Sequence, residues 1–302
     1  MWQSELNGVV YSALNFTSLD KVKNIHIFTR ELRVSYGNPD ATQLLADNLQ
    51  FPFVIKPGEN EILYLSDKKM SKLDKSLKKL SLASFDPDQW DYAKSRRNDS
   101  PVEYQMAWQP GTPLVFLYSG GGYSLQGGYA FVLNTNNGHI CELNLGGPVD
   151  RVARWSSDGH YLAFAKAKSY TEFSDTIDLA ILDSITGDLR TIDVVPPDVK
   201  GQYSVTDLTW TPDNLHLLVF VNIPSMYDSF ETMHHKLYFV DFTTGQSVPL
   251  FPEFKSFFAV GTSGKNNFAW SPDDLKLLIR CPSLTGRTTD RFCLISVQRS
   301  EQ

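Results

Sequence analysis

Apolar and polar positions follow one another along this chain in a phrase that recurs six times. Each copy has a bulky apolar anchor, a short polar turn rich in Asp, Pro or Gly, and then an apolar run typical of a β-strand. The anchors are Trp2, Ile55, Trp108, Trp155, Trp210 and Trp270. Successive anchors lie 53, 53, 47, 55 and 60 residues apart. A repeat of this length is typical of β-propellers, in which each repeat forms one blade.

A second phrase follows the first within the repeats. It consists of an apolar run, a turn that contains glycine, and another short run. The turn glycines are Gly138, Gly187 and Gly245 in the third, fourth and fifth repeats. Each phrase predicts two antiparallel strands joined by a tight turn. The two phrases together therefore predict a four-stranded antiparallel blade in each repeat.

These phrases resemble the TolB-like (WD-like) β-propeller repeat, whose hallmarks are a Trp-Ser-Pro-Asp-Gly turn and a later turn with Thr-Gly. The resemblance covers nearly the whole chain and is strongest over 152–297. It implies an all-β fold, a six-bladed β-propeller of four-stranded antiparallel blades, formed by a single domain over 1–302. It says little about function, because the repeat occurs in translocation proteins, peptidase accessory domains, lyases and scaffolds.

Both ends of the chain depart from the repeat. The sequence begins inside the first phrase, so most of the innermost strand of that blade is missing. Only five residues follow Val297, where the last apolar run ends. We therefore expect incomplete or unorthodox closure of the propeller, or a chain that is a segment of a longer protein.

The composition excludes several classes of protein. The net charge of −6 disfavours a nucleic-acid partner, since general nucleic-acid binders carry a basic excess. No apolar run approaches the roughly 20 residues that span a bilayer, so we expect no membrane span. The first residues do not resemble a signal peptide, and we expect a cytoplasmic protein. The alternative, a periplasmic protein whose export signal has been removed, follows from the TolB resemblance.

The cysteine content is too low for a disulfide scaffold. The chain has three cysteines, Cys141, Cys281 and Cys293. Cys281 and Cys293 flank one predicted hairpin, where a bond across it is one interpretation. We expect instead that both are buried thiols.

Long and short connections segregate to opposite faces of the predicted blades. The turns within each phrase are short, whereas the connections between phrases are long and contain Tyr, Phe and Met, residues enriched at interface cores. Packing of these side chains back onto the blades is the alternative explanation. We predict that a protein partner binds this loop-rich face through Tyr123, Tyr170, Phe173, Tyr227, Phe230, Phe254 and Phe257.

Lysines concentrate in the second repeat of this acidic protein. Nine basic and four acidic residues lie within 68–97. In the same region, four apolar residues have helical spacing: Met70, Leu73, Leu77 and Leu80. One interpretation is a solvated sheet edge that its lysines protect from aggregation. The other is an electrostatic patch for an acidic partner, formed by Lys72, Lys75, Lys78 and Lys79.

The residues with catalytic potential have structural explanations. Asp158, Asp213 and Asp273 lie in turns, where carboxylates accept backbone hydrogen bonds. The anchor tryptophans are expected to fill the gaps between blades. His234 and His235 are adjacent, and neighbours in an extended segment point in opposite directions, which makes a poor metal site. We predict no catalytic residue, no metal and no cofactor.

These observations predict a non-catalytic scaffold that binds a protein partner on its loop-rich face. An enzyme is the alternative: a propeller lyase or hydrolase with its site at the channel mouth, using His234 or His235. A third interpretation is a sensor or accessory domain of a larger protein.

Overall fold

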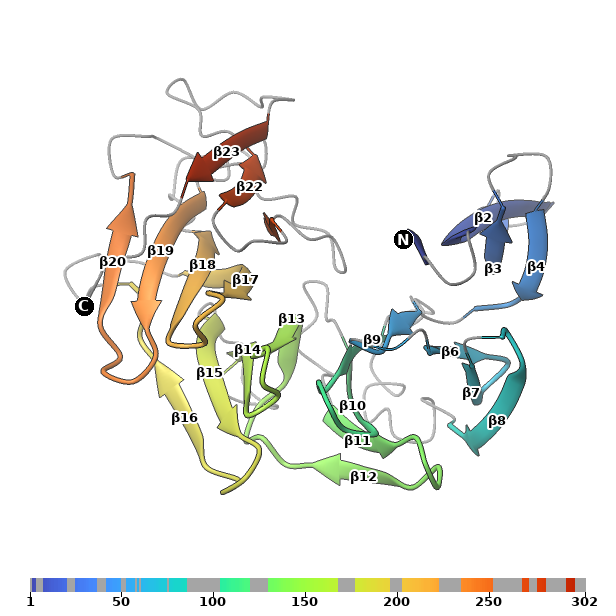
Figure 1. The fold of residues 1–302 in the computed structure, drawn as a ribbon, viewed down its shortest axis with the longest axis horizontal. Coiled ribbons are helices and arrows are strands. Elements are labelled where there is room, and N and C mark those ends of the chain that lie inside the picture. The colour runs from blue at the N-terminus through green and yellow to red at the C-terminus, as the bar shows by residue number, and fades with distance from the viewer. Residues whose placement is uncertain are drawn as a thin grey trace. The chain divides into compact units, whose positions relative to one another are not determined.

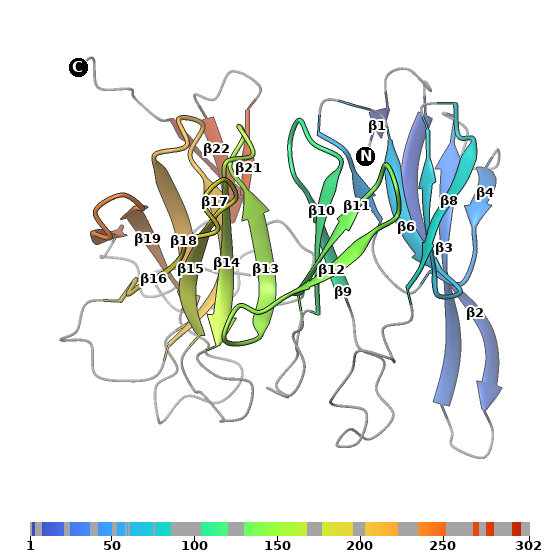
Figure 2. The same cartoon turned by 90° about the horizontal axis from the view of Figure 1, so that it is seen from below.

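The computed structural model of the chain contains β-strands as its only regular elements among the residues it describes (Figures 1 and 2). The described residues are 2–3, 8–20, 25–36, 42–49, 53–57, 59, 61–74, 76–85, 104–119, 130–167, 177–195, 203–222, 235–251, 268–271, 276–280 and 292–296. Among these residues, the structure has no apolar helix of the length that spans a bilayer. The predicted all-β class is confirmed.

The chain divides into two compact units. The amino-terminal unit comprises Met1–Ser119 and Tyr129–Leu143, and the carboxy-terminal unit comprises Gly120–Gly128 and Asn144–Gln302. The single domain over 1–302 that the repeats predict stays a prediction.

Three four-stranded antiparallel sheets form the amino-terminal unit, each with its strands in chain order. The first contains β1 (Trp2–Gln3), β2 (Gly8–Asp20), β3 (Ile25–Ser35) and β4 (Thr42–Ala46). The second contains β5 (Val54–Ile55), β6 (Ile62–Ser66), β7 (Lys69–Leu73) and β8 (Lys79–Ser84). The third contains β9 (Tyr104–Trp108), β10 (Leu114–Ser119), β11 (Ala130–Asn134) and β12 (Ile140–Leu143).

The carboxy-terminal unit contains two groups of four antiparallel strands and a group of three (Figure 1). The first group is β13 (Val149–Trp155), β14 (Tyr161–Ala167), β15 (Ile177–Asp183) and β16 (Leu189–Ile192). The second is β17 (Ser204–Trp210), β18 (His216–Asn222), β19 (His235–Asp241) and β20 (Ser247–Leu250). One parallel pair, Ile177 with Ser204, joins these two groups into one sheet. The last group is β21 (Phe268–Trp270), β22 (Lys276–Arg280) and β23 (Phe292–Ser296).

Local sequence accounts for the tight turns between the outer strands. In the turns that follow β15 and β19, Gly187 and Gly245 have φ values of 79° and 75°, a left-handed conformation that glycine adopts without a Cβ penalty. Each glycine donates its backbone N–H to the carbonyl of the aspartate four residues earlier, Asp183 or Asp241, at 2.9 Å. The Thr-Gly part of the repeat is therefore a turn signal.

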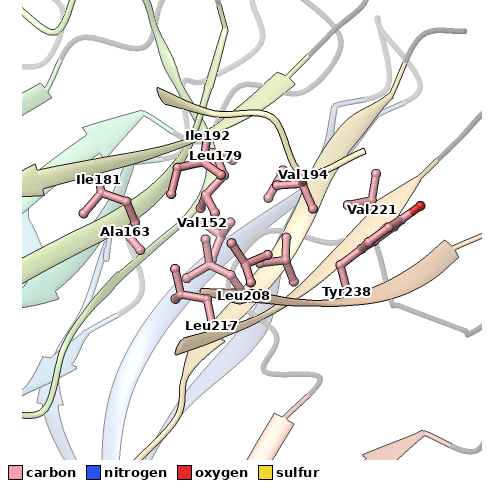
Figure 3. Close-up of a cluster of buried hydrophobic side chains, with 14 of the residues drawn as sticks. Val152, Ala163, Leu179, Ile181, Ile192, Val194, Leu208, Leu217, Val221 and Tyr238 are labelled. Carbon is pink, nitrogen blue, oxygen red and sulfur yellow. The ribbon is translucent and has the colours of Figure 1, made fainter. Parts of the chain in front are cut away.

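Apolar side chains packed between neighbouring sheets form the cores of both units. In the carboxy-terminal unit, Val152 and Leu179 from β13–β16 share one buried cluster with Leu208 and Val221 from β17–β20 (Figure 3). A second cluster joins β17–β20 to β21–β23. In the amino-terminal unit, one cluster joins the first sheet to the second, and another joins the second to the third. Neighbouring sheets within each unit thus bury apolar faces against each other, as repeat proteins do.

The lysine-rich segment of the second repeat forms a hairpin. Strands β7 and β8 pair antiparallel, and the helical spacing of their apolar residues does not correspond to a helix. The Asp74 carboxylate accepts the N–H groups of Ser76 and Lys78 at 2.9 Å each, and Leu77 has a φ of 61°. This turn places apolar residues of two strands at a spacing that resembles a helical period.

One cysteine differs from the prediction. Cys293 on β23 is disulfide-bonded, so the expectation of a buried thiol at this position is wrong. Cys281 lies outside the described residues. Cys141 is exposed and carries a free thiol. The spacing of two cysteines alone does not show whether their thiols face each other, so it does not predict the bond at Cys293.

Candidate functional site

In the carboxy-terminal unit, the segments that connect the strands are short at one end of the strands and long at the other. At the turn end, the strands are joined by segments of five residues: 156–160, 184–188, 211–215, 242–246 and 271–275. At the opposite end, the loop end, segments of 9 to 17 residues follow: 168–176, 193–203, 223–234, 251–267 and 281–291. The two ends of this unit therefore differ in the length of their connecting segments, which are short at the turn end and long at the loop end.

Tryptophans hold the three groups of strands in the same orientation. The Trp210 indole N–H donates to the carbonyl of Arg154 at 2.9 Å, and the Trp270 indole N–H donates to the carbonyl of Trp210 at 3.1 Å. These bonds align the turn ends of β13, β17 and β21. Trp210 is also buried in the cluster between its sheet and the preceding one, which confirms the expected gap-filling role for this residue.

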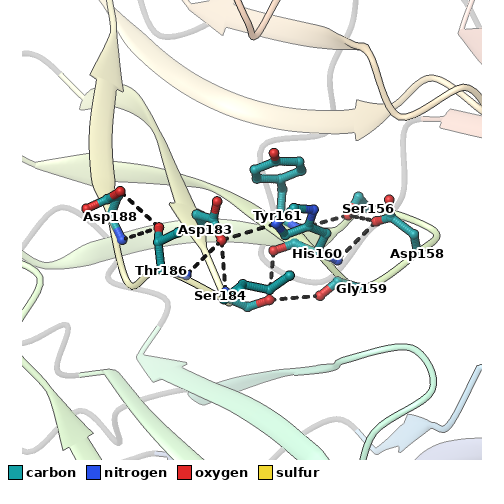
Figure 4. A network of polar contacts seen from close by, with 10 residues as sticks. Ser156, Asp158, Gly159, His160, Tyr161, Asp183, Ser184, Thr186 and Asp188 are labelled. Atoms are coloured by element: carbon teal, nitrogen blue, oxygen red, sulfur yellow. Dashed lines mark hydrogen bonds and ion pairs between the residues drawn. The ribbon is translucent and has the colours of Figure 1, made fainter.

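The polar network at the turn end stabilises its own turns (Figure 4). The Asp158 carboxylate accepts the Ser156 hydroxyl at 2.5 Å and the N–H of His160 at 3.0 Å. Asp183 accepts the N–H groups of Ile185 and Thr186 at 2.8 and 3.1 Å. The hydrogen bond from the Thr186 N–H is the main reason why the pKa of Asp183 lies below its usual range.

The predicted structural role of the turn aspartates is confirmed where they are described. Asp213 accepts the N–H of Leu215 at 2.9 Å and the hydroxyl of Thr211 at 2.5 Å, as Asp158 does in the preceding sheet. Burial raises the pKa of Asp213, but these hydrogen bonds outweigh it and the pKa is lowered. Asp273 lies outside the described residues.

Ser184, His160 and Asp183 lie close together at the turn end but do not form a nucleophilic triad. The His160 Nε2 lies 3.2 Å from the Asp183 Oδ1. The Ser184 hydroxyl, however, donates to the carbonyls of Gly159 and His160 at 3.2 and 2.8 Å (Figure 4). A triad needs the serine hydroxyl to bond the imidazole that activates it. The contacts of this serine are those of a turn residue.

A different polar group, the loop-end cluster, consists of Lys166, Asp178 and Tyr203. Asp178 is 4% exposed, and its Oδ1 accepts the Tyr203 hydroxyl at 2.7 Å. Lys166 lies directly opposite Asp178 in the β14–β15 register. The cluster lies at the strand ends where Ile177 pairs with Ser204 and the two sheets meet.

Burial sets the electrostatics of the loop-end cluster. Burial, together with the hydrogen bond to Asp178, raises the pKa of Tyr203, so the phenol keeps its proton and remains a donor. Burial also lowers the pKa of Lys166, and the negative charge of Asp178 offsets part of this effect. The chemistry available here is a charge-assisted hydrogen bond that ties β15 to the start of β17.

A third polar contact between the same sheets lies nearer their middle. The Arg154 guanidinium is 3.8 Å from the Asp207 carboxylate, which is 2% exposed. The turn-end tryptophan, this pair and the loop-end cluster therefore connect the two sheets along their length.

The predicted binding residues fall mostly outside the described part of the chain. This holds for all seven aromatic residues, Tyr123, Tyr170, Phe173, Tyr227, Phe230, Phe254 and Phe257, and for Lys75 and His234. Their roles stay predictions. Within the described residues, no group of three His, Cys, Asp or Glu side chains has the arrangement of a metal site.

The remaining lysines of the predicted electrostatic patch differ from one another. Lys78 and Lys79 are exposed at the start of β8. Lys72 is half-buried, and its Nζ lies 3.2 Å from the Glu61 carboxylate. Because Glu61 neutralises Lys72, the positive charge available to a partner comes from Lys78 and Lys79 among the described members.

The loop-end cluster was not anticipated from the sequence. Lys166 and Asp178 are charged residues at the ends of otherwise apolar runs, 161–167 and 177–182, which is the signal that could have identified them. Their connection to Tyr203 depends on two sheets meeting, and no local pattern predicts it.

Comparisons with known proteins identify the fold of this chain but not its family. No family model and no curated protein sequence matches this chain. A GH74 xyloglucanase from Xanthomonas campestris matches with a TM-score of 0.60 and 12% identity, over 90% of this chain and 42% of that one. Acylaminoacyl peptidase from Pyrococcus horikoshii matches with a TM-score of 0.55 and 10% identity, over 90% and 41% of the two chains. TolB from Acinetobacter baumannii matches with a TM-score of 0.49 and 14% identity, over 82% and 53%.

At these identities the matches concern the fold alone. The β-propeller fold predicted from the TolB-like, WD-like repeats is confirmed by the similarity to the propeller structures of the xyloglucanase and the peptidase. The chain spans 53% of the TolB chain and 42% and 41% of the two enzyme chains, so the activities of those proteins are not transferred to it.

Proposed function

We propose that this protein is a non-catalytic interaction platform that binds a protein partner at its loop end. The observation that supports the proposal is the difference between the two ends of the carboxy-terminal unit. Every turn-end connection has five residues, whereas the loop-end connections have 9 to 17. Binding residues lie disproportionately on loops that a rigid scaffold positions.

The sequence of the loop-end segments supports a protein partner over a small ligand. Six of the seven predicted binding aromatics belong to three of these segments: Tyr170, Phe173, Tyr227, Phe230, Phe254 and Phe257. Aromatic residues dominate the energetics of protein interfaces. The loop-end cluster lies where two loop-end segments, 168–176 and 193–203, join strands β15 and β17.

In the same proposal, the sheets are the blades of one six-bladed propeller. The six sequence anchors and the sheets that bury their faces on one another support this count. A propeller enzyme or an accessory domain of a larger protein shares this architecture, so function has to be tested at the loop end.

The test is capture of partners from an extract of the native cells with the intact chain as bait. The double variant Tyr227→Ala, Phe230→Ala should lose the specific partner, because aromatic hot spots at interface centres contribute about 2 kcal/mol or more each. A matched control removes two exposed apolar side chains at the turn end: Ile185→Ala, Leu215→Ala, where the residues are 76% and 54% exposed. Equal loss of the partner in both variants contradicts the proposal.

The lysines have a separate, kinetic role in this proposal. Lys78→Glu with Lys79→Glu should slow association with an acidic partner and remove most of its salt dependence, because charges at the rim of an interface act mainly on the association rate. Association rates measured at several ionic strengths test this. Lys72→Gln is the control, since its charge is already paired with Glu61.

The disulfide changes the proposal for localisation. Disulfides persist in oxidising compartments and are rare in the cytosol. The bond at Cys293 therefore supports the periplasmic alternative over the cytoplasm. Thiol labelling of the protein in intact cells, with and without prior reduction, distinguishes the two compartments.

A further inference from the structure

Three asparagines next to strands β11 and β12 accept a backbone N–H in the same way. The side-chain oxygens of Asn134, Asn137 and Asn144 accept the N–H groups of the residues two positions later, at 2.9, 3.0 and 3.0 Å. In such a turn the side-chain carbonyl takes the place of a backbone carbonyl, so its carbon, Cγ, lies over the peptide nitrogen of the next residue. The three side chains therefore share one local geometry.

The residue that follows each asparagine distinguishes the three turns. Thr135 and Leu145 follow two of the asparagines, and their side chains obstruct the approach of the peptide nitrogen to Cγ. Gly138 follows Asn137 and has no Cβ to obstruct this approach. Asn137 is exposed, so water reaches it. Among the three asparagines, Asn137 therefore has the least hindered contact between its own Cγ and a backbone nitrogen.

We propose that Asn137 is a site of spontaneous deamidation, in which its side-chain amide becomes a carboxylate through a cyclic imide with Gly138. The Gly138 nitrogen attacks Cγ, and the His139 N–H donates to the oxygen on which negative charge develops. The bond from Cγ to the amide nitrogen breaks, and this nitrogen leaves as ammonia with the proton of the Gly138 N–H, which water relays. Water then adds to either carbonyl of the imide and opens it, which gives aspartate or isoaspartate.

The folded turn between β11 and β12 slows the first step. The Gly138 N–H donates to the Asn134 carbonyl at 2.8 Å, so the attacking nitrogen is engaged while the turn is closed. The Thr135 hydroxyl anchors the turn, because it donates to the carbonyl of Pro113 at 2.9 Å. Attack on Cγ therefore requires a local opening of the turn, which needs less free energy than global unfolding. The rate in the folded chain lies below the rate in the unfolded chain.

The isoaspartate product weakens the contact between the second and third sheets. Isoaspartate routes the backbone through the side chain and adds one methylene group before Gly138. Gly138 has a φ of 73°, and there is no room for a Cβ between it and the carbonyl oxygen of Leu82 on β8. A longer backbone displaces Gly138 from this close approach, whereas aspartate keeps both the backbone and the acceptor for the His139 N–H. This inference does not depend on the proposed function.

The experiment measures conversion at each asparagine by peptide mapping with mass spectrometry, after the intact chain is incubated at neutral pH. Asn137 should convert at least about tenfold faster than Asn134 or Asn144, because poor positioning of a nucleophile costs this much or more. Conversion of Asn137 should be faster still in concentrated urea, where the turn is open. Conversion of Asn137 no faster than that of Asn144 overturns the proposal, and so does a rate in the folded chain that equals the rate in urea.

Two matched variants test the turn as the gate. Thr135→Val removes the hydroxyl that anchors the turn and should raise the rate at Asn137 several-fold in the folded chain but not in urea. Ser184→Ala removes the equivalent hydroxyl from the turn after β15 and should leave that rate unchanged. Equal rates in the two variants contradict the gate.

A second measurement tests the consequence for the fold. Chromatography separates the aspartate and isoaspartate forms of the aged chain, and urea denaturation gives the midpoint of each. The aspartate form should unfold with the parent and with the variant Asn137→Asp, whereas the isoaspartate form should unfold at a lower urea concentration. The variant Asn137→Gln, whose longer side chain closes the imide poorly, should keep its midpoint on ageing. Equal midpoints for the isoaspartate form and Asn137→Asp contradict the predicted loss of the contact with Leu82.

Discussion

At the turn end of the carboxy-terminal unit, Asp183 and Asp241 each accept two backbone N–H groups from their own turns. At the loop end, Asp178 accepts the hydroxyl of Tyr203, a residue 25 positions away on the neighbouring group of strands. The turn aspartates Asp183 and Asp241 are half-buried, whereas Asp178 is 4% exposed. The same residue type, aspartate, thus stabilises a turn at one end of the unit and joins two groups of strands at the other.

The difference shows where each carboxylate gets its partners. A turn carboxylate finds its hydrogen-bond donors within four residues of its own position, so it can stabilise the turn in any sheet that contains the motif. A buried carboxylate must be satisfied by a partner that only the packing of sheets provides, and loss of that partner leaves it desolvated and unpaired. Four predictions test this contrast between contacts within one turn and contacts between sheets. They are given in order of decreasing expected effect.

The first prediction concerns a turn glycine that also contacts a neighbouring sheet. Gly138 has a φ of 73°, and a Cβ there would lie 2.3 Å from the carbonyl oxygen of Leu82. Gly138→Ala should lower the free energy of unfolding by about 3 kcal/mol, because left-handed strain adds to a backbone clash. Urea denaturation measures the change.

Gly187→Ala is the matched control for that prediction. Gly187 has a φ of 79°, but nothing lies within 4 Å of the added Cβ. Its cost should therefore be the left-handed strain alone, about 1 kcal/mol. Equal costs for the two substitutions would show that the approach of Leu82 contributes nothing.

The second prediction concerns the hydrogen bond at the loop end. Tyr203→Phe should lower the free energy of unfolding by about 2 kcal/mol, because it leaves the buried Asp178 carboxylate without its donor. Tyr161→Phe is the control, since that ring packs against the same core. Its hydroxyl has no such carboxylate acceptor among the described contacts, and its cost should be below about 0.5 kcal/mol. A double-mutant cycle with Asp178→Asn should show coupling between the two residues, and additive effects would contradict the prediction.

The third prediction concerns pH and the turn end. The folded-state pKa values of Asp183 and Asp241 are lowered, first by the backbone hydrogen bonds from Thr186 and Thr244. Their stabilisation is therefore complete above the unfolded pKa of about 3.9 and is lost as the pH falls through the folded values. Asp183→Asn with Asp241→Asn should flatten the dependence of the free energy of unfolding on pH below about pH 4. Chemical denaturation at pH 3 and pH 7 checks this, and an unchanged difference between the two pH values argues against it.

The fourth prediction is the smallest. His160 pairs with Asp183 at 3.2 Å, but its side chain is 33% exposed. His160→Ala should therefore change the free energy of unfolding by less than about 0.5 kcal/mol at pH 7. A cost of several kilocalories per mole in thermal denaturation would mean that the turn end depends on side-chain pairing more than the backbone contacts indicate.

Much of the fold could be predicted from the sequence because its signals are local. The anchor tryptophans and turn glycines identified the strands of the fourth and fifth repeats, and Asp158 and Asp213 cap the turns in which they were expected. The spacing of apolar residues around Leu77 suggested a helical period where the chain forms a hairpin, because a turn brought residues of two strands into a helix-like pattern. The state of Cys293 was also mispredicted, since it depends on which thiol it faces.

The candidate site was less accessible to sequence reasoning. The predicted aromatic residues lie outside the described part of the chain, so their role stays a prediction. Lys72 looked equivalent to Lys78 and Lys79, yet Glu61 on a neighbouring segment pairs with it. Pairing of this kind depends on strand register, which a count of charges does not contain.

The amino-acid sequence alone specifies where the strands and tight turns lie, because a turn closes through hydrogen bonds within about four residues. It also determined that one end of the blades has short connections and the other long ones. The contact of Tyr203 with Asp178 and the hydrogen bond from Trp210 to the Arg154 carbonyl arise only when the sheets pack. These contacts join residues from different strands or sheets, and their energies depend on burial that exists only when the sheets pack.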